Sequence, residues 1–149
     1  MGNRHTILVA GWSYRQDVLA SLMTEKNDAY SWSKKDILDE FDLTDRIYQY
    51  EIAYYPLHIE AEPDNPYDPQ AVMVYAGDDF VGYLPRGGFP ELKSYAMIEG
   101  VNCYVQIKGG KYKHFEHDDD ADYLDTWEDK YMRLVTDSTE YKAVIVFEW

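Results

Sequence analysis

The feature that most constrains the fold is the stretch Glu62–Pro69, EPDNPYDP, which holds three prolines and three Asp or Asn residues. Each proline fixes its own φ and pushes the residue before it toward extended geometry. Asp and Asn side chains accept hydrogen bonds from nearby backbone N–H groups. We therefore expect a stiff, shaped loop that presents the Tyr67 ring, and not a flexible connection.

Two β-type runs follow this loop. Ala71–Ala76 and Phe80–Leu84 are separated by Gly77-Asp78-Asp79, a turn-forming sequence. The pattern predicts a β-hairpin that carries the loop on its rim. A stiff polar loop with an aromatic ring in that position is suited to gripping a small ligand or a nucleotide.

The remaining segments predict further strands and two or three helices. Apolar residues recur at helical spacing in three places, and Ser33 with Asp36 three residues later forms a plausible N-cap. The expected helices are Gln16–Met23, Lys34–Phe41 and Pro90–Ile98, the last of them stopped by Gly100.

Runs rich in β-forming residues predict the strands. These are Thr6–Gly11, Arg46–Glu60 (one long bent strand, or two, with Pro56 at a bulge or edge), Val101–Ile107 and Tyr141–Phe147. We expect a polar loop through Gly109-Gly110 and His117–Asp122, and a short amphipathic helix over Asp122–Leu134. The sum is a mainly β chain with α-helices, a small barrel of five to seven strands covered by two or three helices.

The loop and hairpin also resemble a known family. Pro63-x-Asn65-Pro66-Tyr67-Asp68-x-x-Ala71-Val72-x-Val74, then Val81-Gly82-Tyr83-Leu84-Pro85, is similar to the signature of the HIRAN domain, and Val9-Ala10-Gly11-Trp12-Ser13-Tyr14 is similar to its first strand and the aromatic residue that follows. The resemblance covers about 7–105, with a poorly matched insertion at about 15–45. It implies a stand-alone HIRAN-like domain over 1–149 with an OB-like barrel, a family-like core at 7–105, and an acidic C-terminal extension, 106–149, that ends in a strand.

HIRAN domains attached to helicase-like remodelling enzymes bind the 3′ end of single-stranded DNA. The resemblance implies that this chain does the same through Tyr14, Asn65, Tyr67, Asp68, Tyr83 and Arg86. An aromatic face stacked on a base contributes ~1–3 kcal/mol, and a carboxylate accepts a hydrogen bond from a free 3′-hydroxyl. The family often has a second basic residue where this chain has only Arg86. In the alternative interpretation, Asn65 and Asp68 only build the turn and Tyr67 packs beneath it.

The net charge of −14 opposes a polyanionic ligand. Residues 116–149 hold eleven acidic and three basic residues, a net of −8, and residues 1–115 hold seventeen and eleven, a net of −6. Any nucleic-acid binding must therefore be local and sensitive to salt. The charge favours a second interpretation, an acidic mimic of DNA that occupies the basic surface of a DNA-processing nuclease, as phage-encoded inhibitors do. The residues that would carry this role are Asp118, Asp119, Asp120, Asp122, Asp125, Glu128 and Asp129.

Other function classes find little support in the sequence. There is no nucleophile-elbow serine, no phosphate-binding glycine loop with lysine, and no cysteine near a histidine, so we expect no enzyme, with a small hydrolase as the discounted third interpretation. His114 and His117 are three residues apart and the acidic run lacks the glycine and final glutamate of a calcium loop, so we expect a solvated loop, no metal and no cofactor. The single Cys103 and the lack of a membrane span or signal peptide predict a cytoplasmic protein with no membrane partner.

Overall fold

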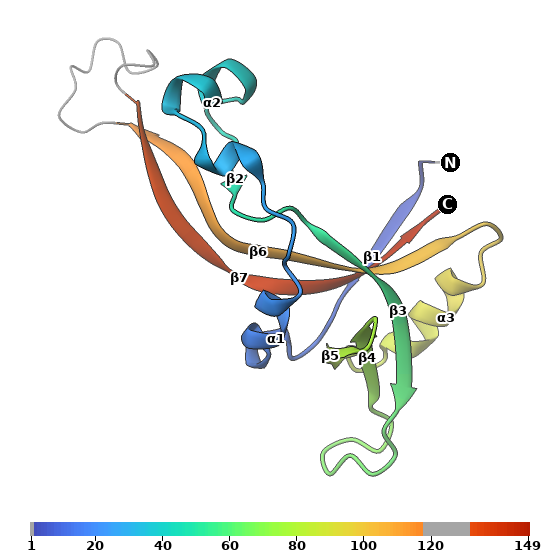
Figure 1. Ribbon diagram of the computed structural model, residues 1–149. Helices are drawn as coiled ribbons and strands as arrows, with labels where there is room; N and C mark the ends of the chain where they lie inside the picture. The colour runs from blue at the N-terminus through green and yellow to red at the C-terminus, as the bar shows by residue number, and fades with distance from the viewer. Residues whose placement is uncertain (1, 118–131) are drawn as a thin grey trace. The chain divides into compact units, whose positions relative to one another are not determined.

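The computed structural model describes residues 2–117 and 132–149 (Figure 1). The described chain is mainly β, and its strands form an antiparallel, strongly curled half-barrel sheet in the order β1-β7-β6-β3-β4-β5, with β2 paired to β6. The strands are β1 (Arg4–Leu8), β2 (Ile47–Tyr48), β3 (Ala53–Ala61), β4 (Val72–Ala76), β5 (Asp79–Tyr83), β6 (Asn102–His117) and β7 (Met132–Glu148). The helices are α1 (Gln16–Ser21), α2 (Lys34–Glu40) and α3 (Gly88–Ala96), with 3-10 turns η1 (Trp12–Tyr14) and η2 (Asp28–Ser31). The predicted fold class is confirmed.

The chain divides into two compact units. The first contains residues 1–24, 52–108 and 140–149, and the second contains 25–51 and 109–139. The loop and hairpin that the sequence singles out belong entirely to the first unit.

A single bridge joins the two edges of the curled sheet in the first unit. The Ala10 N–H donates to the Tyr83 carbonyl at 2.7 Å, and the Tyr83 N–H donates to the Ala10 carbonyl at 2.9 Å. Gly82 permits this approach, because a Cβ at its position would lie 2.3 Å from the Ala10 oxygen, and its φ of 150° is one that other residues rarely adopt. The segment after β1 and the end of β5 are thereby held together.

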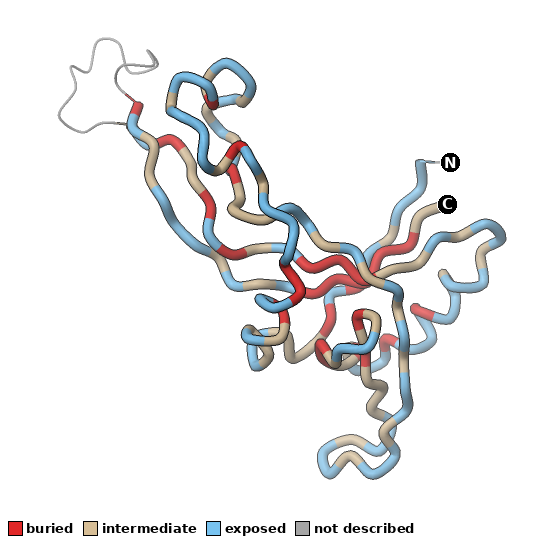
Figure 2. The backbone as a smooth tube through the Cα atoms, in the orientation of Figure 1, coloured by how far each residue is buried: buried red, intermediate tan, exposed pale blue. Residues whose placement is uncertain are grey.

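The core of the first unit is built around β7. Five consecutive residues, Ala143–Phe147, are buried, so both faces of this strand are covered (Figure 2). Phe147 packs against Tyr95 of α3, with ring centroids 5.6 Å apart. Leu92, one helical turn before, is also buried. These contacts hold α3 against the sheet.

The second unit has its own hydrophobic cluster. Its buried members are Ala29, Ile37, Ile47, Phe115 and Met132. Helix α2 begins where the sequence predicts, because the Ser33 side-chain oxygen accepts a hydrogen bond from the Asp36 N–H at 3.2 Å.

The structure confirms the two-strand alternative for residues 46–60, which form β2 and β3, and Pro56 lies within β3 opposite Tyr104. Two other predictions are wrong. Gly109-Gly110 is not a loop but part of β6, where both residues have positive φ, and β6 continues beyond them with β7 beside it and with Tyr112 and Lys113 paired to β2. The predicted helix over 122–134 is wrong at residues 132–134, which belong to β7, and its other residues lie outside the described part of the chain.

Candidate functional site

The loop after β3 is organised by the side chain of Asn65. Its Oδ1 accepts hydrogen bonds from the N–H groups of Tyr67 at 2.8 Å and Asp68 at 3.0 Å. Its Nδ2 donates to Oε1 of Glu62 at 2.7 Å. Asp68 in turn accepts from the Gln70 N–H at 2.9 Å through Oδ1. These Asx turns give the loop its shape from its own residues.

Tyr83 anchors this loop to the hairpin. Its hydroxyl donates to the Glu62 carboxylate, at 3.1 Å and 3.3 Å to the two oxygens. Burial, and then this hydrogen bond, raise the pKa of Tyr83. The Arg15 guanidinium lies over the rings of Phe80 at 4.4 Å and Tyr83 at 5.5 Å. The structure therefore places both Asn65 and Tyr83 in contacts that hold the loop in position.

Tyr67 and Tyr14 present open rings. The exposed fractions of these residues are 91% and 89%. Tyr67 is therefore not packed beneath its own turn, contrary to the architectural alternative. A planar face this accessible can stack on a base or another flat group.

A cavity of about 400 Å³ lies beside the loop in the first unit. Its walls come from the second half of the loop, the end of the hairpin and the start of α3. Its polar lining residues are Asp68, Gln70 and Arg86, and its apolar walls include Val72, Leu84, Phe89 and Pro90. The structure thus brings together two of the predicted site residues, Asp68 and Arg86. Tyr14, Asn65, Tyr67 and Tyr83 do not line this cavity.

The two charged residues of the cavity are available to a ligand. Arg86 is exposed and forms no ion pair with any described residue. One carboxylate oxygen of Asp68 is engaged by the Gln70 N–H, and no described donor reaches the other. A hydroxyl donor and an anionic group on one ligand would find complementary partners here.

Sequence reasoning did not identify the α3 wall of the cavity. Gly87, Gly88, Phe89 and Pro90 line it, and Phe89 is 46% exposed. Helix α3 begins after Gly87, which has φ 77° and offers no side chain as a cap. The sequence could have indicated a turn at this wall, because clusters of Gly and Pro mark turns and one such cluster is Pro85-Arg86-Gly87-Gly88-Phe89-Pro90.

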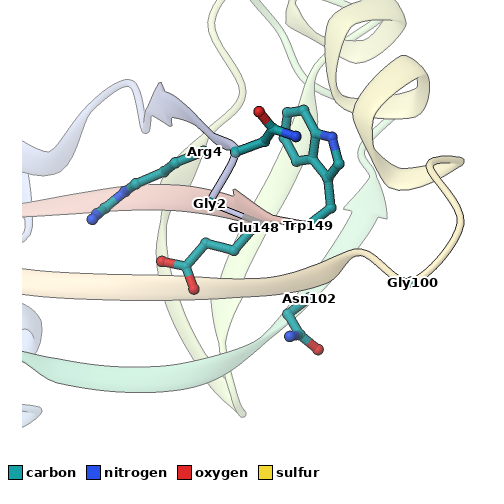
Figure 3. Close-up of a pocket in the computed structure, with 7 residues that line it drawn as sticks. Gly2, Arg4, Gly100, Asn102, Glu148 and Trp149 are labelled. Atoms are coloured by element: carbon teal, nitrogen blue, oxygen red, sulfur yellow. The ribbon is translucent and has the colours of Figure 1, made fainter.

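A second cavity, of about 480 Å³, also lies in the first unit and is shown in Figure 3. Arg4, Asn102, Glu148 and Trp149 are among its lining residues. The side chains of Arg4 and Glu148 extend away from the Trp149 ring (Figure 3). Glu148 accepts a hydrogen bond from Tyr104 at 2.7 Å, and Arg4 donates to Gln106 at 3.1 Å. Its charged groups are thus engaged with the protein and do not converge on one point.

The remaining candidate residues lie in the second unit. His114 lies on β6, with Nε2 3.8 Å from Glu116 Oε1 and 3.9 Å from Asp137 Oδ2. Within residues 2–117 and 132–149, no group of three His, Cys, Asp or Glu residues is arranged to hold a metal ion. The residues proposed for DNA mimicry lie outside the described residues: Asp118, Asp119, Asp120, Asp122, Asp125, Glu128 and Asp129.

Comparison with known proteins found no matching family model, no matching curated protein and no matching solved structure. The HIRAN resemblance therefore remains a prediction that depends on the loop and hairpin residues. None of the helices in the described part of the chain is both long and apolar enough to span a membrane.

Proposed function

We propose that this chain is a non-enzymatic module that binds the 3′ end of single-stranded DNA in the cavity beside the loop Glu62–Pro69. The observation that carries the proposal is the placement of Asp68 and Arg86 in one cavity, next to a loop whose only aromatic ring is 91% exposed. These are the side chains for which the sequence predicts contact with hydroxyl, phosphate and base.

Each group has a distinct task in this proposal. The Tyr67 ring stacks on a base near the end of the strand. The unengaged oxygen of Asp68 accepts a hydrogen bond from the terminal 3′-hydroxyl. Arg86 pairs with the phosphate that precedes the terminal sugar. Val72, Leu84 and Phe89 give the sugar and base edge an apolar wall.

The Asp68 carboxylate makes the site prefer the 3′ end of a strand over an internal nucleotide. At an internal position, the 3′ oxygen carries a phosphate instead of a proton, and its negative charge meets Asp68. The same repulsion acts on the whole strand, because the protein carries a net charge of −14. We therefore expect micromolar affinity that weakens as salt screens the Arg86 contact.

The test is fluorescence anisotropy at low salt with three oligonucleotides of one sequence. One ends in a 3′-hydroxyl, one in a 3′-deoxy sugar and one in a 3′-phosphate. We expect the hydroxyl end to bind most tightly and the phosphate end to bind most weakly. Asp68→Asn should reduce the penalty on the phosphate end, whereas Asp64→Asn, an exposed residue of the same loop, should leave it unchanged. If none of the three oligonucleotides binds, the proposal fails.

The net charge favours one second candidate, an acidic protein that competes with DNA for a basic surface. Its test is competition with duplex DNA for a nuclease that has a basic channel. Replacing the Asp118–Asp122 aspartates by asparagine should abolish competition, and unchanged competition would exclude mimicry by these residues.

A further inference from the structure

His5 on β1 contacts α3 at two points. Its Nε2 lies 2.5 Å from Oε1 of Glu91. Its ring stacks on Tyr95, with centroids 3.8 Å apart and planes inclined by 7°. Glu91 and Tyr95 are four residues apart, so they lie one turn apart on the same helix face. One side chain of the sheet therefore contacts α3 at both Glu91 and Tyr95.

Glu91, one of the two residues that His5 contacts, directly follows residues that line the cavity beside the loop. Gly88, Phe89 and Pro90 form the first turn of α3 and line that cavity, and Glu91 is the next residue. No side chain caps the helix at Gly87, so the first turn has no local anchor of that kind. Its position therefore depends on contacts such as the one that His5 makes.

We infer that His5 is a positioning residue for the α3 wall of this cavity, and that protonation of His5 strengthens ligand binding there. The part about ligand binding rests on the proposed function. A charged imidazolium attracts the Glu91 carboxylate more strongly than a neutral imidazole does. It is also attracted to the face of the Tyr95 ring on which it stacks.

The surroundings of His5 favour this direction. The titratable groups in contact with its ring are Glu91 and Tyr95, both on α3. From β7 the contact is with the ring of Phe147, at 6.4 Å between centroids. The neighbouring cation on β1, Arg4, donates its hydrogen bond to Gln106. Both contacts are therefore stronger for the imidazolium than for the neutral ring, which a comparison of two pH values tests.

The first arm of the test needs no ligand. The amides of Leu92 and Lys93 bond back to the first turn of an α-helix, so their hydrogen-exchange protection reports on that turn. After correction for intrinsic exchange rates, we expect their protection to be about two- to fivefold greater at pH 6 than at pH 8. His5→Gln should remove this difference, and the matched control His58→Gln, an exposed histidine on β3, should retain it. Equal pH dependence in all three proteins would overturn the inference.

The second arm measures the affinity for the 3′-hydroxyl oligonucleotide at the same two pH values. We expect about two- to fivefold tighter binding at pH 6, with no such gain in His5→Gln or Glu91→Gln and an unchanged gain in His58→Gln. If hydrogen-exchange protection changes with pH but the affinity for the oligonucleotide does not, the claim that protonation of His5 strengthens ligand binding is overturned. Altered protection with no binding at either pH would reject the proposed function while supporting the positioning role of His5.

Discussion

Tyr83, the last residue of β5, donates its hydroxyl hydrogen bond to Glu62, the residue with which the proline-rich loop begins. The same carboxylate accepts a hydrogen bond from Asn65, which organises the rest of the loop. The Glu62 carboxylate therefore connects the loop to the hairpin. Substitutions that remove its hydrogen bonds should affect both the stability of the protein and ligand binding.

Tyr83→Phe should lower the free energy of unfolding by about 1–2 kcal/mol, because a half-buried carboxylate loses a donor. Urea denaturation measures the loss. Tyr54→Phe is the control, since Tyr54 is exposed, and it should change stability by less than about 0.5 kcal/mol. Equal losses in the two variants would contradict the anchoring role of Tyr83.

Gly82→Ala should destabilise the first unit by more than about 2 kcal/mol, because the added Cβ would lie 2.3 Å from the Ala10 carbonyl oxygen. Gly100→Ala is a matched control with φ 76° and open space around it, and it should cost about 1 kcal/mol. Thermal unfolding of both variants measures the two losses of stability. Similar losses would show that the backbone at the Ala10–Tyr83 bridge shifts to accommodate the added Cβ.

Tyr67→Ala should weaken oligonucleotide binding by about 5- to 150-fold, the factor that corresponds to ~1–3 kcal/mol of stacking on one base. The ring is exposed, so the stability of the protein should be almost unchanged. Anisotropy titrations give the affinity, with Tyr54→Ala as an exposed aromatic control from β3. A loss of affinity in the control as large as that in Tyr67→Ala would argue against a stacking site at Tyr67.

Arg86→Gln should reduce the slope of log K against log salt by about 0.7, the contribution of one phosphate contact on a single strand. Titrations at several salt concentrations measure this slope. Lys93→Gln removes an exposed charge from α3, outside the cavity lining, and should leave the slope nearly unchanged. If the Arg86 variant keeps the full slope, Arg86 makes no phosphate contact.

Alkaline pH should destabilise the protein partly through Tyr104. Burial, and then its hydrogen bond to Glu148, raise the pKa of Tyr104 from 10.0 to about 12. Between these values the unfolded chain loses this proton first, so the stability that Tyr104 contributes is complete below pH 10 and falls as the pH rises toward 12. Urea midpoints across this range should fall less steeply in Tyr104→Phe than in the wild type or in Tyr14→Phe.

The loop was predictable from sequence because its structure is local. Prolines and Asx side chains act on their immediate neighbours, so EPDNPYDP alone indicates the turns that Asn65 and Asp68 form. The Ser33 cap of α2 was predictable for the same reason.

The other features of the fold and of the site depend on contacts between residues that are far apart in the sequence. Gly109-Gly110 is typical of a loop, but β6 runs through it to His117, with β7 and β2 as its neighbours in the sheet. The cavity combines the loop with the first turn of α3, and no local pattern indicates that Asp68 and Phe89 line the same cavity. Asn65 and Tyr83 were predicted as binding residues, and the structure places their polar groups in contacts within the protein.

The pairing of β1 with β7 has a consequence for synthesis on the ribosome. Leu8 lies opposite Val144 and Arg4 lies opposite Glu148, so β1 gains this partner only after the whole segment between them has been made. Closing so long a segment is slow, because chain entropy is lost before the contact forms. The nascent protein should therefore keep apolar residues of its barrel open to chaperones until translation reaches β7.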